Sequence, residues 1–222
     1  MLLFQVLTQL EHLDIWGSEI TNEGASILKA CTRLRFLNVS WTHATRLPPL
    51  PNMRYLNMSN CTIHSICGGD PEVQIPLEKF TASAASFGNI DEVFSSIEAS
   101  SFSFLDMSAS SLSDLYILQK MKSLEHLDLS LSRITDDAIQ YVAYIGMNLR
   151  YLSLKNTGIT SQAVSILAGT VPNLSSLSLA YTKIDDSALV YISVMPSLRL
   201  IDLSHTSIKG RAFSFHLFLS ID

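Results

Sequence analysis

The stretch LEHLDL, from Leu124 to Leu129, carries the pattern that decides the fold: leucine, two variable residues, leucine, one variable residue, leucine. In an extended segment, side chains alternate between two faces. The second and third leucines therefore point to one face, and the residues between and beside them point to the other. The stretch predicts a short strand with one buried face and one exposed face.

The same six-residue phrase occurs nine times in the chain of 222 residues. The copies begin at Leu10, Leu34, Met53, Leu77, Phe102, Leu124, Leu149, Leu174 and Leu198. Successive starts are 24, 19, 24, 25, 22, 25, 25 and 24 residues apart. A nearly constant period of this length indicates an array in which each repeat buries its apolar residues against its neighbours.

Each predicted strand is followed by features of a turn and, in the later repeats, of a helix. The ninth position is a small residue, usually Ser or Thr, which we expect to bond backbone groups where the chain leaves the sheet. The segments that start at Thr135, Thr160 and Asp185 have apolar residues at helical spacing. We expect a side chain at each of these starts to cap a helix.

Two parts of the chain depart from this regularity. The repeat from Leu34 to Met53 contains Pro48, Pro49 and Pro51, which remove backbone donors and disfavour a helix, so the segment is expected to be extended. The second irregular part covers residues 68–113. Its repeats are rich in serine and place Phe80 and Phe102 at leucine positions.

Residues 10–210 resemble a leucine-rich repeat array, and the later units resemble those of intracellular F-box-associated and related plant proteins. The spacing Cys31-x-x-Leu34 fits that style, while the Leu-x-Gly-x-Ile-Pro signature of plant extracellular arrays is absent. The resemblance implies an α/β leucine-rich repeat solenoid. This is a right-handed horseshoe of about nine repeats, with a parallel sheet on the concave side and helices or extended segments on the convex side. It also implies binding of a partner protein, and more narrowly substrate recognition for a ubiquitin ligase.

Composition agrees with one folded array over residues 1–222. Apolar residues make up 47% of the chain and charged residues 16%, which argues against disorder. The net charge of -5 is unsuited to nucleic acid, and no apolar run approaches the roughly 18 residues of a membrane span. Three cysteines are too few for a secreted disulfide framework. We expect a cytoplasmic or nuclear protein.

The binding surface is expected on the concave face, where variable strand positions project into solvent. The third position of the phrase is a ring side chain in six repeats, and the fifth is often Asp or Asn. The seventh adds Trp16, Ser40, Ser59 and Lys155, among others. Rigid rings with polar groups at their edge are typical of interfaces. We predict a partner-binding surface of His12, Asp14, Trp16, Phe36, Asn38, Tyr55, Asn57, Phe104, Asp106, His126, Asp128 and Tyr151.

Three other functions are alternatives to protein binding. A small-molecule sensor would use an aromatic pocket formed by Trp16, Phe36, Trp41 and Tyr55. Catalysis would use the pairs His12–Asp14 and His126–Asp128, but the sequence gives them no nucleophile or phosphate loop. A zinc site would use Cys61, His64 and Cys67, with Asp70 as a fourth ligand. We expect no enzymatic activity, no cofactor and no metal.

The two ends of the array also carry an expectation. Terminal repeats of a solenoid normally need a polar capping unit. Here the first phrase starts at Leu10, and the segment 212–219 after the last repeat is apolar. We expect uncapped or truncated ends, with missing repeats or self-association as the two explanations.

Overall fold

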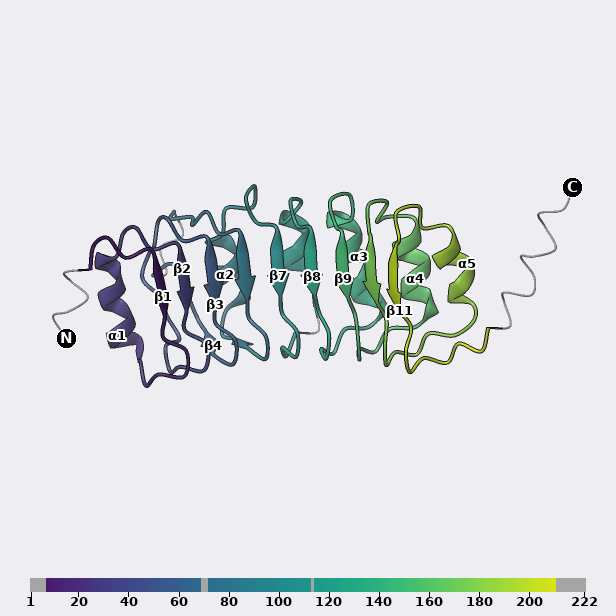
Figure 1. The fold of residues 1–222 in the computed structure, drawn as a ribbon, viewed down its shortest axis with the longest axis horizontal. Helices are drawn as coiled ribbons and strands as arrows, with labels where there is room; N and C mark the ends of the chain where they lie inside the picture. Colours follow the sequence, from purple (N-terminus) through teal and green to yellow (C-terminus); the bar gives the residue numbers. More distant parts are fainter. Residues whose placement is uncertain (1–6, 69–71, 113, 211–222) are drawn as a thin grey trace, which may run out of the picture. The chain divides into compact units, whose positions relative to one another are not determined.

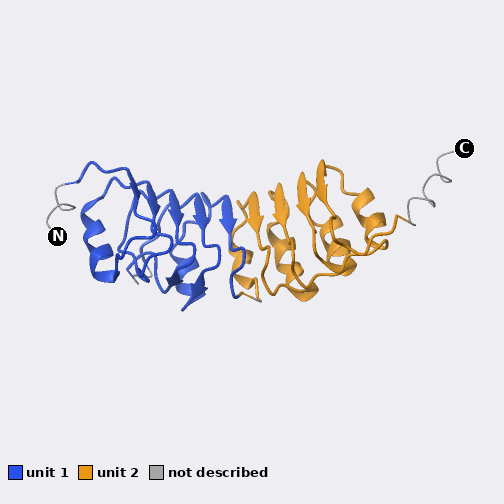
Figure 2. Cartoon of the chain, turned by 60° about the horizontal axis from the view of Figure 1, so that its bottom comes forward, with its two compact units in different colours: residues 1–111 blue, residues 112–222 orange. Residues whose placement is uncertain are grey.

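The computed structural model describes residues 7–68, 72–112 and 114–210, in which the phrase of every repeat forms one short strand (Figure 1). Each of these nine strands covers the third to fifth positions of its phrase, as the alternation predicts. The chain divides into two compact units, residues 1–111 and 112–222 (Figure 2).

Unit 1 contains a parallel sheet in the order β1-β2-β3-β5-β7. Equivalent repeat positions are register partners, so that His12 lies opposite Phe36 and Phe36 opposite Tyr55. This constant register lines up side chains of the same position in a column across the sheet. The strands are β1 (His12–Asp14), β2 (Phe36–Asn38), β3 (Tyr55–Asn57), β5 (Lys79–Thr81) and β7 (Phe104–Asp106).

The connections between the strands of unit 1 are mostly not helical. Residues 39–54 contain no helix, which confirms the effect predicted for the prolines. Helices do occur after the first and fourth strands of this sheet. The connecting elements are α1 (Asn22–Ser26), the 3-10 helix η1 (Ile27–Ala30), α2 (Ile90–Ser95) and a two-stranded parallel sheet of β4 (Thr62–Ile63) and β6 (Ser86–Phe87).

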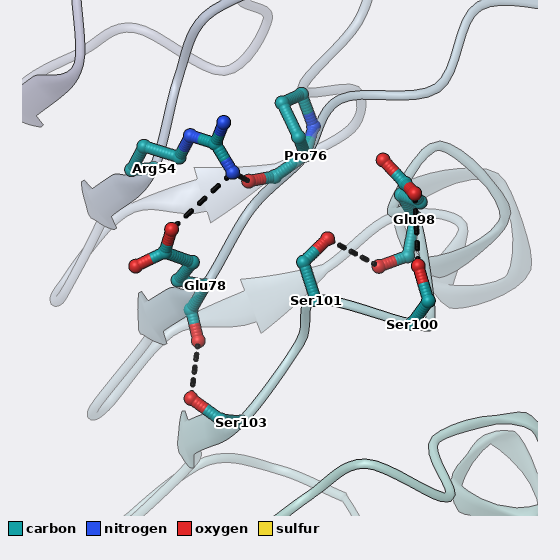
Figure 3. Close-up of polar contacts among 7 residues, drawn as sticks. All are labelled: Arg54, Pro76, Glu78, Glu98, Ser100, Ser101 and Ser103. Atoms are coloured by element: carbon teal, nitrogen blue, oxygen red, sulfur yellow. Dashed lines mark hydrogen bonds and ion pairs between the residues drawn. The ribbon is translucent and has the colours of Figure 1, made fainter.

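The irregular part of unit 1 keeps the repeat register. Phe80 and Phe102 occupy leucine positions and are completely buried, as predicted. Polar contacts tie the strand entries together (Figure 3). Nη1 of Arg54 lies 3.2 Å from a carboxylate oxygen of Glu78 and donates to the carbonyl of Pro76, and the Ser103 hydroxyl donates to the carbonyl of Glu78. Side-chain bonds between neighbouring repeats therefore support the backbone ladder here.

Unit 2 has the regular strand-and-helix alternation, and its helices lie along one side of its strands (Figure 2). Helix α3 packs against η2 and α4, and α4 packs against α5. The strands are β8 (His126–Asp128), β9 (Tyr151–Ser153), β10 (Ser176–Ser178) and β11 (Leu200–Asp202). The helices are η2 (Tyr116–Lys120), α3 (Asp136–Ile145), α4 (Ser161–Ala168) and α5 (Ala188–Ser193).

The helix starts follow the predicted positions, but only one predicted cap forms. The Thr160 hydroxyl accepts from the backbone N–H of Gln162, 3.2 Å away, as expected for an N-cap. Thr135 makes no capping bond, and this prediction was wrong. Asp136, next to it, instead accepts from the backbone and hydroxyl of Thr160 in the following repeat. At α5 the N-cap is Ser187, two residues after the predicted Asp185.

The ninth position bonds the backbone where the chain leaves the sheet in five repeats, as predicted. The hydroxyls of Thr42, Ser132, Thr157, Thr182 and Thr206 donate to the carbonyl of the sixth position in the same repeat, three residues earlier. The buried hydroxyls of Ser18 and Ser110 make no such bond, and Ala85 has none to make. In Thr42, Thr157 and Thr206 this bond is 2.7 Å long. The Cys61 thiol fills the same place and donates to the Val39 carbonyl of the preceding repeat at 3.2 Å. The bond satisfies a carbonyl that the buried turn would otherwise leave without a donor.

In the described ranges, no helix has the length and apolar character needed to cross a membrane.

Candidate protein-binding surface

The strand face, which we define as the sheet face formed by the third and fifth repeat positions, carries stacked rings. His12 stacks on Phe36 with 3.9 Å between ring centroids and 6° between planes. His126 stacks on Tyr151 at 3.9 Å and 1°. The strand register places these partners side by side. Stacked rings have few alternative rotamers, so this surface loses little side-chain entropy when a partner binds.

A lysine interrupts the ring column in unit 1. The ammonium of Lys79 lies 5.6 Å from the ring centroid of Tyr55 and 5.6 Å from that of Phe104. These distances are in the range of cation–π attraction. The lysine therefore joins the two rings across β3, β5 and β7. Sequence analysis found the rings but assigned no contact to Lys79.

The acidic and amide side chains of the fifth position have a structural task that the sequence prediction did not include. Oδ1 of Asp14 accepts from the backbone N–H of Trp16 at 3.1 Å. The same bond to the residue two positions later recurs in Asn38, Asn57, Asp106, Asp128 and Asp202. One oxygen of each side chain thus holds the turn after the strand.

The prediction that the seventh position projects into solvent was wrong for two of the named residues. Ser40 and Ser59 are buried, and their hydroxyls donate to Asn38 and Asn57 at 2.7 and 2.8 Å. The chain has begun to turn at this position, so the strand alternation no longer applies. Trp16, whose side chain is 64% exposed, and Lys155 do project into solvent.

The eighth position, which sequence analysis passed over, has a positive φ in all nine repeats. Gly and Asn tolerate a left-handed backbone better than other residues. They stand at this position in three repeats, as Gly17, Asn60 and Asn156. Those residue types were the available signal. The position also holds Trp41 and Leu131, whose side chains are 63% and 56% exposed. The turn therefore presents large side chains at the rim of the strand face.

The side chains proposed for an aromatic pocket do not form an enclosed cavity. Trp16 and Trp41 are each more than 60% exposed, so they stand out from the surface. A depression of about 430 Å3 lies instead on the strand face of unit 2. It is lined by Asp128, Ser130, Tyr151, Ser153, Lys155, Ser176, Leu177, Ser178, Leu200, Ile201 and Asp202.

The two cysteines of the alternative zinc site, Cys61 and Cys67, make other contacts in the structure. Besides the Cys61 bond to Val39, the buried thiol of Cys67 donates to the Val73 carbonyl at 3.6 Å. Asp70 lies outside the described residues. Within residues 7–68, 72–112 and 114–210, no three His, Cys, Asp or Glu side chains are grouped so that they could hold a metal ion.

Two carboxyl groups of unit 2 have a lowered pKa. For Asp185 the largest cause is the hydrogen bond from the Ser187 hydroxyl, followed by that from Ser161. For Asp202 it is the bond from the backbone N–H of Ser204. Both side chains are therefore ionised well below neutral pH. In unit 1, burial raises the pKa of the Cys31 thiol.

Comparisons with known proteins agree with this architecture. A family model described as Leucine Rich repeat matches residues 120–143, which include β8 and most of α3. No curated protein matches the chain.

Several solved structures share the fold. Internalin C2 from Listeria monocytogenes has a TM-score of 0.58 at 21% identity. The match covers 96% of this chain and 80% of the internalin chain. The ectodomain of a plant membrane receptor kinase from Arabidopsis thaliana has a TM-score of 0.58 at 17% identity. The match covers 90% of this chain and 25% of the receptor chain. A leucine-rich repeat protein from Leptospira interrogans has a TM-score of 0.57 at 17% sequence identity, and the match covers 88% of this chain and 55% of that protein's chain. Together with the nine repeats in register, these matches show that the chain has the leucine-rich repeat fold.

Proposed function

We propose that this protein is a non-enzymatic interaction module that binds a partner protein on its strand face. The observation that carries the proposal is the pair of ring stacks, His12 on Phe36 and His126 on Tyr151, which are fixed by the strand register. Such rings provide contact area at low entropic cost, and the polar groups beside them provide specificity.

The proposed contact residues are those that the sequence indicated. The fifth-position side chains among them keep one oxygen in the turn, so the second oxygen or the amide group faces the partner. Binding on this fold has a precedent, because the structure of the plant receptor ectodomain was solved in complex with Casparian strip integrity factor 2. The residues are His12, Asp14, Trp16, Phe36, Asn38, Tyr55, Asn57, Phe104, Asp106, His126, Asp128 and Tyr151.

Affinity capture from cell extract tests the proposal. The unaltered protein is compared with the triple variant Phe36→Ala/Tyr55→Ala/Tyr151→Ala, after circular dichroism has shown that the variant is folded. The control is Tyr144→Ala/Tyr191→Ala, which removes two exposed rings from α3 and α5. Specific proteins lost only with the triple variant support the strand face. An identical set in all three samples places the interface elsewhere.

A narrower form of the proposal is substrate recognition for a ubiquitin ligase in the cytoplasm or nucleus. It rests on the resemblance of the later repeats to F-box-associated arrays. The expected result is that ligase subunits appear in the captured material, and that the level of the strand-face partner rises when the proteasome is inhibited. A captured partner with unchanged turnover, and no ligase subunit, would leave the general proposal in place and remove the narrower one.

A further inference from the structure

The depression on the strand face of unit 2 has a floor of small residues. Ser153, Ser176 and Ser178 occupy strand positions that in other repeats hold rings or longer polar side chains. Tyr151 borders the depression on β9 and Leu200 on β11, where 67% of the Leu200 side chain is exposed. The hollow is thus bounded by apolar groups and open to a side chain from outside.

The charges around the depression are unbalanced. Asp128 and Asp202 each use Oδ1 to hold the turn after the strand, and neither has a cationic group within 4.0 Å among the described residues. The one cation of the lining is Lys155, whose ammonium lies 5.6 Å from the ring centroid of Tyr181. The lining therefore has two negative charges and one positive charge, and the single positive charge acts on Asp202 as well as on the Tyr181 ring.

The spacing of the two carboxylates suits an extended chain. Asp128 and Asp202 stand at the same repeat position on β8 and β11, which are three strand steps apart in the order β8-β9-β10-β11. Three steps correspond to roughly 14 Å. In an extended segment, side chains four residues apart are separated by roughly 13 Å and point to the same face. The side chain halfway between them would lie over the serine floor.

We infer that this depression binds an extended protein segment with two basic side chains four residues apart and an aliphatic side chain midway between them. The basic groups pair with Asp128 and Asp202. The aliphatic group enters the hollow between Tyr151 and Leu200. The Ser176 hydroxyl, which has no hydrogen-bond partner among the described residues, is available to the backbone of the segment. This inference rests on the proposed function and specifies the chemistry of the partner.

Labelled peptides test the charge preference directly. The probe is a five-residue peptide of sequence Arg-Gly-Leu-Gly-Arg with blocked ends, and the controls replace both arginines by glutamate or by glutamine. Binding is measured by fluorescence anisotropy at low salt and again at roughly 0.2 M salt. The arginine peptide is expected to bind most tightly and to weaken as salt rises, because exposed ion pairs are screened.

Substitutions in the depression then locate the site. Asp128→Asn and Asp202→Asn keep the turn, because Asn38 and Asn57 hold the same turn in their repeats. Each is expected to weaken the arginine peptide roughly two- to fivefold, and the double variant roughly tenfold. Asp137→Asn on α3 is the matched control and is expected to change nothing. Lys155→Met removes a like charge and is expected to strengthen binding of the arginine peptide.

The outcomes separate this inference from the proposed function. Tighter binding of the glutamate peptide, no binding of any peptide, or equal binding to the double variant overturns the inference. The partner captured from extract is then tested with Asp128→Asn/Asp202→Asn. If that variant keeps the partner while Phe36→Ala/Tyr55→Ala, which leaves the depression unaltered, loses it, the proposed function stands and the depression is not the contact. If the peptide result holds but the triple variant loses no partner, the broader proposal fails.

Discussion

At the scale of single residues, the left-handed eighth position costs stability wherever it holds a branched side chain. Leu131 has φ 60° and Asn156 has φ 52° at the equivalent position of the next repeat. Asn adopts this conformation more easily than Leu, by about 1 kcal/mol. Leu131→Asn is therefore expected to raise the free energy of unfolding by that amount, measured by urea denaturation. Asn156→Leu should lower the free energy of unfolding by the same amount. If neither substitution changes the free energy of unfolding, the turn is not strained.

Asp185 makes stability depend on pH through its accepted hydrogen bonds. Its pKa is lowered in the folded state, because Ser187 and Ser161 donate to the carboxylate at 2.5 and 2.8 Å. Its contribution is therefore complete above the unfolded pKa of about 4 and is lost as the pH falls through the folded pKa.

Asp185→Asn is expected to lower the melting temperature at pH 7 and to have a smaller effect at pH 2.5, where the carboxyl group of the unaltered protein is protonated to a greater extent. Melting curves recorded by circular dichroism at the two pH values check this. Asp137→Asn, in the same unit, should follow the unaltered protein at both. An equal loss for Asp185→Asn at both pH values would mean that the charge is not what stabilises this turn.

At the scale of the helices, two threonines at equivalent positions have unequal roles. Thr160 caps α4 and donates to Asp136, whereas Thr135 precedes α3 without a capping bond. Thr160→Ala is expected to cost about 1–2 kcal/mol of unfolding free energy, and Thr135→Ala only a few tenths. Urea denaturation of both variants is the measurement, and each serves as control for the other. Equal losses would contradict the assigned cap.

The strands were predictable from sequence and the turns were not, for a physical reason. Leucine spacing indicates which residues of a strand are buried, and so it placed the nine strands of the phrases at their observed positions, whereas β4 and β6 were not predicted. A left-handed turn depends on the backbone, and Trp41 or Leu131 in that position gives no sign of it. The N-cap of α2 was overlooked although Asn89 and Glu92 were a visible signal, and Asn89 accepts from the N–H of Glu92.

On the scale of the whole molecule, the ring column was predictable but the depression was not. Rings at the third position repeat at the period of the phrase, so a column follows once the strands are in register. The depression depends on small residues from β9 and β10 and on charges from β8 and β11. No single repeat contains that combination. Its recognition requires knowing which strands are neighbours.

The array should also lose stability locally, because each repeat contacts mainly its neighbours. Cys31, Cys61 and Cys67 are buried and all lie in unit 1, so thiol labelling reports the opening of that unit. Phe80 is fully buried and packs near Phe94, with 6.1 Å between ring centroids. Phe80→Leu, although it restores the commonest residue of its position, is expected to cost about 1–2 kcal/mol.

The rate of thiol labelling by a chromogenic disulfide reagent in moderate urea is compared for Phe80→Leu and Thr160→Ala. Thr160→Ala is expected to lower the free energy of unfolding by a similar amount, but in unit 2. Phe80→Leu should accelerate thiol labelling roughly tenfold, since about 1.4 kcal/mol corresponds to that factor in the population of the open form. Thr160→Ala should accelerate it much less, because its repeat lies far along the chain from the cysteines. Equal acceleration by both variants would mean that all the repeats open in one cooperative step.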